Sequence, residues 1–273
     1  MKLIALLLFL LLPCCVADDF NNLANGFAPL TPHDAAIMAS NQYDSNSRRQ
    51  GITLLSNSPF GGAPEYLRLY RDYIEEDHDP LVRASAIKAL ARFGTSEDAM
   101  LIVPWLDMST TQSIQVRRAA GRALQRLHNP SVVPALLLSL RNQDEENQVR
   151  TTIAIALGQY AEKRVYNGLI EGLRAINLSI NLASAQSLHV LTGQVFGIDW
   201  DEWYDWSELV EDAGGSLFAF KSDYEYPTYQ HQARWWDKVT FWEHRIHERP
   251  DFPVGLKEAS VMSTYDDDAE TSQ

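Results

Sequence analysis

The residues best suited to chemistry in this chain are a series of arginines at regular intervals. Arg83, Arg117 and Arg150 recur at separations of 34 and 33 residues. Guanidinium groups bind carboxylates and phosphates, and inside a fold they also bind main-chain carbonyls. The acidic residues Asp79 and Glu146 precede two of the three arginines. We therefore favour a structural ladder in which each arginine joins one repeat to a carboxylate or to helix-end carbonyls.

Further basic residues lie close to these arginines, and a structural ladder explains them less well. In a chain with a net charge of −13, this local concentration predicts a basic stripe on one face. Such a stripe suits a protein or acidic peptide partner, with Arg118, Arg122 and Arg126 as the main electrostatic contacts. The candidate partner-binding residues are Arg83, Lys88, Arg117, Arg118, Arg122, Arg126 and Arg150, and Arg92 belongs to the same basic set.

A second cluster lies in the sequence WEHRIHE. His244 and Glu248 are four residues apart and would share one face of a helix, and His247 lies beside them. Imidazole and carboxylate at this spacing can hold zinc. His231 and Glu243 could add ligands. The same composition is typical of a solvated helix face, and we favour that interpretation; we therefore predict no cofactor and keep a metal as the weaker alternative.

The chain contains none of the motifs of common catalytic centres: GxSxG, the Walker loop, GxGxxG or HExxH. Both cysteines, Cys14 and Cys15, lie in the N-terminal leader, so the rest of the chain has no thiol for catalysis, disulfides or zinc ligation. The negative net charge argues against nucleic acid as the main partner. We predict a protein without enzymatic activity.

The leader itself predicts export. Lys2 is followed by an apolar run from Leu3 to Leu12, which is too short to span a bilayer. A signal peptide cleaved after Ala17 fits the small residues at Cys15 and Ala17. Acylation of Cys14 or Cys15 is the alternative, and only this lipid anchor would bring the chain to a membrane. The predicted location is the periplasm or the cell envelope.

The elements that must position the arginines repeat in the same way. The segments DPLVRASAIKALARF, SIQVRRAAGRALQRL and ENQVRTTIAIALGQY begin at Asp79, Ser113 and Glu146, and a looser copy begins at Ser179. Each shows apolar residues at helical spacing, and a second aligned set follows, such as Asp98, Ile102 and Leu106. Self-similarity at this period predicts an all-α solenoid of about five helical hairpins.

The repeats resemble HEAT repeats, in particular the short bacterial kind found in phycobilisome-lyase-type proteins. The marks are the D-P-x-V-R start at Asp79–Arg83 and the A-L-x-x-F/L/Y helix end, and the resemblance covers about residues 47–193. It implies a generic binding scaffold. By the same likeness, a lyase-like enzyme or enzyme subunit stays open, although a bilin lyase would act on cytoplasmic pigment proteins. A metal-dependent hydrolase using His244 and His247 and a structural envelope component also stay open.

The sequence LTGQVFGIDWDEWYDW, which resembles the end of many exported bacterial HEAT-repeat proteins, predicts a helix capped by Asp199 with Trp203 and Trp206 on one face. We favour an aromatic lid over the last repeat. A stacking platform for a sugar or peptide, with Trp235 and Trp242, is the alternative. The predicted organisation is a signal peptide at 1–17, a flexible lead-in at 18–32, the solenoid at 33–193, the capping helix at 194–213, an extension packing on the array at 214–259, and a disordered acidic tail at 260–273.

Overall fold

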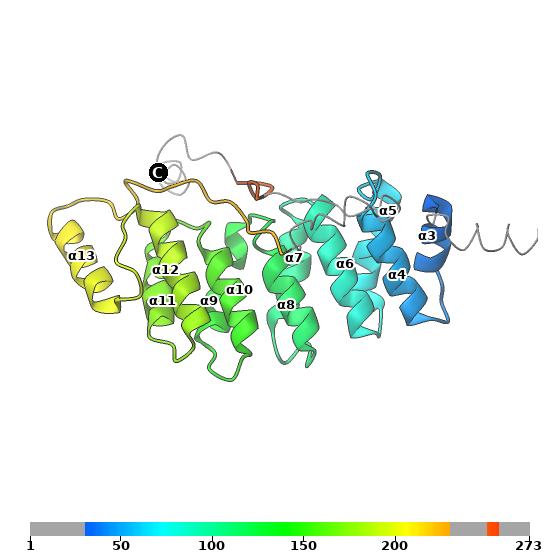
Figure 1. Ribbon diagram of the computed structural model, residues 1–273, viewed down its shortest axis with the longest axis horizontal. Coiled ribbons are helices and arrows are strands. Elements are labelled where there is room, and N and C mark those ends of the chain that lie inside the picture. The colour runs from blue at the N-terminus through cyan, green and yellow to red at the C-terminus, as the bar shows by residue number, and fades with distance from the viewer. Residues whose placement is uncertain (1–30, 230–249, 257–273) are drawn as a thin grey trace, which may run out of the picture.

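The computed structural model describes residues 31–229 and 250–256. Within these residues, eleven α-helices and two 3-10 helices follow one another, and the two β-bridges lie outside any named strand. The helices stack side by side as antiparallel hairpins along the long axis of the molecule (Figure 1). The predicted all-α solenoid of about five helical hairpins is confirmed.

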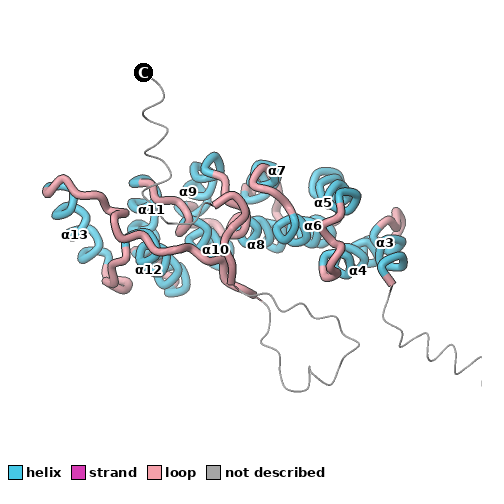
Figure 2. Tube along the Cα trace, turned by 90° about the horizontal axis from the view of Figure 1, so that it is seen from above, coloured by secondary structure: helices cyan, strands magenta, loops and turns pink. Residues whose placement is uncertain are grey.

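The hairpins form two layers (Figure 2). The inner layer contains α4 (Ser45–Ser56), α6 (Pro80–Phe93), α8 (Ile114–Ala123), α10 (Asn147–Leu157) and α12 (Leu178–Thr192). The outer layer contains α5 (Pro64–Glu76), α7 (Asp98–Ile102) with the 3-10 helix η1 (Val103–Leu106), the 3-10 helix η2 (Pro130–Val132) with α9 (Val133–Arg141), α11 (Lys163–Leu173) and α13 (Trp200–Asp212). A further helix, α3 (Pro32–Ala39), packs against α4 at the N-terminal end.

The stack follows from the apolar stripe of each inner helix. The residues at the repeated anchor position, Val82, Val116, Val149 and Ile180, are all fully buried. Small residues allow neighbouring helices to approach closely: a Cβ added to Gly121 on α8 would lie 2.2 Å from the hydroxyl oxygen of Thr152 on α10. A single hairpin cannot bury such a stripe, so the stacked neighbours supply the missing apolar surface.

The outer layer is less regular than the spacing predicts. The set Asp98, Ile102 and Leu106 is divided between α7 and η1, and Pro104 lies at the junction. Proline lacks the backbone N–H that an α-helix interior needs, and its ring clashes with the preceding turn. In the next hairpin, Pro130 and Pro134 similarly divide η2 from α9. Of the five inner helices only α6 contains a proline, Pro80 at its first turn, and all five remain continuous.

After α13 the chain returns along the array. It crosses above α12 and α10 toward α8 (Figure 1). Ser222 N donates to the carbonyl of Val190 at 2.8 Å, and Leu217 and Tyr224 are buried. Residues 250–256 then lie beside the end of α8, where Val254 N donates to the carbonyl of Arg126 at 2.8 Å.

Several predictions fall outside the described residues. These are the signal peptide at 1–17, the alternative lipid anchor at Cys14 or Cys15, most of the lead-in at 18–32, and the acidic tail at 260–273. Among the helices that the structure does describe, none combines the length and apolar character that crossing a bilayer requires.

Candidate functional site

The repeated arginines bind main-chain carbonyls at the end of the preceding outer helix or in the turn that follows it. Each guanidinium thereby ties the inner helix of a hairpin to the segment before it, and satisfies carbonyls that a helix end leaves without an intrahelical partner. The bonds run from Arg83 Nε to Ile74 (2.9 Å), from Arg117 Nη1 to Thr111 (2.9 Å) and from Arg150 Nε to Leu140 (2.9 Å). We call Arg48, Arg83, Arg117, Arg150 and Asn181 the ladder residues.

The first and last ladder residues make the same kind of contact. Arg48 Nη1 donates to the carbonyl of Asn41 at 3.0 Å, and Asn181 Nδ2 donates to that of Ala175 at 2.9 Å. An asparagine amide replaces the guanidinium in the last repeat, and the bond to the turn remains. The ladder therefore runs through all five inner helices, as a structural role for the repeated position predicts.

Two ladder arginines also bind a carboxylate of the following hairpin. Arg117 Nε and Nη2 donate to the two oxygens of Glu145 at 2.8 and 3.0 Å, and both side chains are almost fully buried. Arg48 Nε binds Asp77 at 2.7 Å. Such parallel N–H···O bonds fix geometry as well as adding energy.

These carboxylates are not the two that the sequence indicates. Asp79 accepts hydrogen bonds from the backbone N–H groups of Leu81 and Val82, so it caps the start of α6. Glu146 is at the cap position of α10 and makes no side-chain cap bond. The partners lie instead in the loops before these caps, which the stacking brings against the preceding inner helix.

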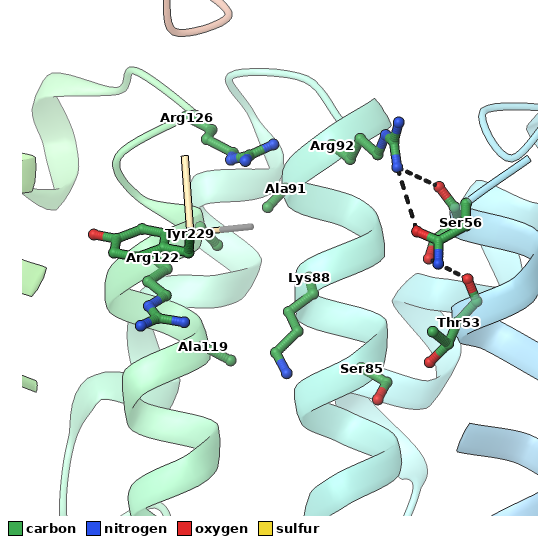
Figure 3. A pocket seen from close by; sticks show the side chains of 12 residues that line it. Thr53, Ser56, Ser85, Lys88, Ala91, Arg92, Ala119, Arg122, Arg126 and Tyr229 are labelled. Carbon is green, nitrogen blue, oxygen red and sulfur yellow. Dashed lines mark hydrogen bonds between the residues drawn. The ribbon is translucent and has the colours of Figure 1, made fainter. Parts of the chain in front are cut away.

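A different set of cations lines a groove of about 350 Å³ on the inner layer, between α4, α6 and α8. Lys88 extends from α6 into the space between α6 and α8, and Arg122 lies on the facing side of α8 (Figure 3). The small side chains Ser85 and Ala119 line the groove between them. We call this site the basic groove; Arg92 and Arg126 also line it.

Burial and neighbouring positive charges together lower the pKa values of cations in the basic groove. Desolvation and the positive charges of Arg122, Arg118 and Arg49 lower the pKa of Lys88, whose side chain is still exposed to solvent. Desolvation also lowers the pKa of Arg122, whose Nε is buried and has no hydrogen-bond partner among the described residues. Arg118 donates hydrogen bonds to the neutral amide oxygens of Gln148 (2.6 Å) and Gln115 (2.7 Å).

Within the described residues, no ion pair joins Lys88, Arg118 or Arg122 to an acidic side chain. Arg117, one position before Arg118 on the same helix, differs from these three residues because it pairs with Glu145. The arrangement can therefore bind an anionic group without first displacing an internal carboxylate.

The chain's own extension covers part of this surface. The guanidinium carbon of Arg122 lies 3.8 Å from the ring centroid of Tyr229, and that of Arg126 lies 4.6 Å from the centroid of Tyr226. The Tyr229 hydroxyl donates to Gln125 Oε1 at 2.9 Å. Sequence reasoning placed these arginines on an open face and missed the two tyrosines. The aromatic sequence YEYPTY was the available signal.

The aromatic residues of α13 cover the last repeat. Trp203 is fully buried, its Nε1–H donates to the carbonyl of Gly197 at 2.9 Å, and its ring meets Phe196 edge-on at 4.9 Å. Trp206 is half-buried beside Tyr166 and Phe196. The Trp203 ring belongs to the core and offers no face to a ligand. Asp199 caps the helix as predicted, accepting from Asp201 N at 3.1 Å.

The remaining predicted candidates cannot be located. They lie outside the described residues, at positions Trp235, Trp242, His231, Glu243, His244, His247 and Glu248. In the part of the chain that is described, no group of three or more histidine, cysteine, aspartate or glutamate residues is arranged to hold a metal ion.

A buried polar cluster beneath the extension also escaped the sequence analysis. Burial, opposed by a hydrogen bond with Gln159, lowers the pKa of His128 to about 4. The His128 ring stacks on that of Tyr160 at 4.8 Å, and Gln159 Nε2 donates to the carbonyl of Leu124 at 2.8 Å. His128 N also donates to the carbonyl of Val254 at 2.9 Å, so the cluster helps to hold the extension. Gln125 and Gln159 are 34 residues apart, which was a signal that they occupy similar places in successive repeats.

Comparison with known proteins bears on the array itself. Residues 102–189 match the family model described as HEAT repeats, a range that runs from the end of α7 into α12. No curated protein matches the chain. The match and the stacked hairpins agree: residues 102–189 are similar in sequence to HEAT repeats, and they form the helical hairpins that such repeats build.

Proposed function

We propose that this protein is an exported, non-enzymatic scaffold that binds a protein partner on its inner layer, through an acidic segment held in the basic groove. HEAT arrays commonly mediate protein–protein interactions through the extended surface that stacked repeats create. The leader sequence supports export to the periplasm or cell envelope. The proposal assigns no cofactor and no nucleic acid partner.

The observation that carries the proposal concerns Lys88, Arg118 and Arg122, none of which forms an ion pair with an acidic side chain among the described residues. The chain has 36 acidic and 23 basic residues, so carboxylates are abundant enough to pair with every cation. Elsewhere the structure uses them, as in the Arg117–Glu145 and Arg71–Asp98 pairs. Like charges held close together destabilise a fold, and such sites are retained where a ligand compensates them. An acidic partner supplies that compensation.

Residues of the basic groove also have the geometry that a peptide needs. The groove is open to solvent along α6 and α8, and its floor contains Ala119, Ala123 and other small side chains that leave room for a backbone. Arg118 does not itself line the groove, but it lies one helical turn from Arg122 on α8, so the two charges can follow an extended segment. Arginine forks bind carboxylates with two parallel hydrogen bonds, which gives specificity as well as affinity.

A pull-down from envelope extract tests the proposal. We expect the double variant Arg118→Glu/Arg122→Glu to recover the partner at least tenfold less well than the unaltered chain, because attraction becomes repulsion. Raising the salt concentration should weaken recovery by the unaltered chain in the same direction. Recovered proteins are identified by mass spectrometry.

The matched control is Arg68→Glu, which reverses an exposed arginine on the outer helix α5. Its recovery should equal that of the unaltered chain, and circular dichroism should show the same helical content in all three proteins. Equal recovery by the double variant and the unaltered chain would refute the basic groove as the contact surface.

A further inference from the structure

The C-terminal extension lies across the array as an irregular segment. Its described parts are residues 214–229 and 250–256, and we call them the strap. Leu217 packs into the core, and Ser222 N donates to the carbonyl of Val190 on α12 at 2.8 Å. A segment of this kind has no helical hydrogen bonds of its own to hold it in place. We therefore expect the strap to open at a lower free energy than the stacked helices.

His128 lies where the second part of the strap meets the array. Its backbone N–H donates to the carbonyl of Val254 at 2.9 Å, and its ring stacks on Tyr160 at 4.8 Å between centroids. His128 is 5% exposed, and its Nδ1 has no hydrogen-bond partner among the described residues. The same holds for the buried hydroxyl of Tyr224 on the strap. Buried polar groups without partners weaken the packing that contains them.

The surroundings of His128 disfavour a positive charge on its ring. Lys221, on the strap, repels such a charge. Burial raises the pKa of Tyr160 and of Tyr224, so these two phenols stay neutral and offer no compensating negative charge. A hydrogen bond with Gln159 favours the charged ring, but burial outweighs it and lowers the pKa of His128 to about 4.

From this geometry we infer that the strap is an acid-released cover of the inner layer, which stays closed while His128 is neutral and opens when its ring takes up a proton. Tyr229 ends the first part of the strap, and its ring centroid lies 3.8 Å from the guanidinium carbon of Arg122. Opening therefore uncovers Arg122 for a partner. This last consequence alone rests on the proposed function.

The direction of the pH effect follows from where the ring is exposed. In the closed form the His128 ring stays neutral down to about pH 4, whereas in the open form it takes up a proton below about pH 6.5. The open form thus binds more protons between these two values, so acid favours opening. From pH 7 to pH 5, the equilibrium constant for opening should rise about twentyfold.

Hydrogen–deuterium exchange of the full chain, followed by NMR at pH 7 and pH 5, tests the inference. The protection factor compares each amide with its intrinsic exchange rate at the same pH, so it isolates the opening equilibrium. For the amides of Ser222 and Val254 it should fall about twentyfold at pH 5. At both pH values it should also be at least tenfold lower than that of Leu124, whose N–H is bonded to the Ala120 carbonyl at the end of α8. Strap amides as well protected as Leu124 would show that the strap opens only with the whole fold, and would overturn the inference.

Two histidine variants identify the titrating group. His128→Gln has no ring to protonate, so the protection of the strap amides should differ less than threefold between the two pH values. If circular dichroism shows that this variant loses helical content, His128→Phe replaces it, because it retains a ring to stack on Tyr160. The matched control is His33→Gln, which changes an exposed histidine on α3 and should keep the twentyfold response. A full response in a folded His128 variant would assign the effect to another group and reject the inference.

No partner is present in the exchange experiment, so the two proposals fail separately. Should the strap respond to acid through His128 while partner recovery is indifferent to Arg118 and Arg122, the proposed function is wrong and the acid-released strap stands. Should protection be the same at both pH values while recovery still depends on these arginines, the strap inference is wrong and the proposed function stands.

Discussion

Two sets of cations on the same helices differ in their contacts. On α8, the ladder residue Arg117 is buried, and it binds a carboxylate with two hydrogen bonds and a carbonyl with a third. Five residues further along the helix, Arg122 pairs with no carboxylate among the described residues, and its buried Nε has no hydrogen-bond partner there. On α6, Arg83 likewise binds the carbonyl of Ile74, whereas Lys88 lines the groove.

This difference separates cations that join one hairpin to the next from cations that we propose bind a partner. The ladder residues satisfy carbonyls at helix ends and hold one hairpin to the next, so their charges are already compensated or bonded inside the fold. Lys88 and Arg122 instead line the groove, where burial and neighbouring positive charges lower their pKa values. Measurements that compare the two sets therefore test the assignment of each.

The largest expected effect is on Arg117. Replacing it by alanine leaves Glu145 buried without its partner, and breaking a buried ion pair in this way costs about 3–5 kcal/mol. We expect the unfolding free energy, measured by urea denaturation, to fall by this amount in Arg117→Ala. In Lys88→Ala it should change by less than about 0.5 kcal/mol. Comparable losses for the two variants would erase the distinction between ladder and groove.

A double-mutant cycle sharpens this result. Arg117→Ala/Glu145→Ala removes both charges, so its loss of stability should be smaller than the sum of the two single losses. Additive losses would mean that Arg117 acts through the Thr111 carbonyl and not through Glu145.

A smaller effect is expected where the extension covers the groove. Tyr229→Ala removes both the stacking on Arg122 and the hydrogen bond to Gln125, and should lower the unfolding free energy by about 1–2 kcal/mol. Tyr229→Phe keeps the ring, so its unfolding free energy should fall by only about 1 kcal/mol. Thermal or urea denaturation of the two variants measures this, and the same stability for both would leave the stacking with no contribution.

The smallest effect concerns the ionisation of Lys88. Desolvation and the charges of Arg122 and Arg118 lower its pKa, so it loses its proton at a lower pH than an ordinary lysine. Arg122→Gln removes one of these charges and should raise the pKa of Lys88 toward its ordinary value. An NMR titration of the Lys88 side chain measures the change; a lower pKa in the variant would contradict the repulsion.

The sequence was sufficient to predict the array but not the partners of its side chains. The period of Val82, Val116 and Val149 determines which residues are buried, because burial depends on helical spacing within one chain segment. The choice of Asp77 and Glu145 over Asp79 and Glu146 depends on how adjacent hairpins stack, which short-range spacing does not encode.

The candidate site was predicted in part for the same reason. Lys88, Arg118 and Arg122 follow from the helical spacing, whereas Tyr229 reaches Arg122 from 107 residues away in the chain, through an extension without repeats. Nothing in the local pattern of either segment indicates the other. The proline-divided outer helices are an intermediate case, since Pro104 and Pro134 are visible in the sequence but the apolar spacing alone predicts continuous helices.

The most direct test of the central claim is the unfolding free energy of Lys88→Glu, measured by urea denaturation beside the matched Lys88→Gln. If the groove cations are held for a ligand and not for the fold, a negative charge among Arg49, Arg118 and Arg122 relieves repulsion. The unfolding free energy should then stay the same or rise in Lys88→Glu. A loss of more than about 2 kcal/mol would show that Lys88 stabilises the fold as the ladder residues do, and would contradict this account.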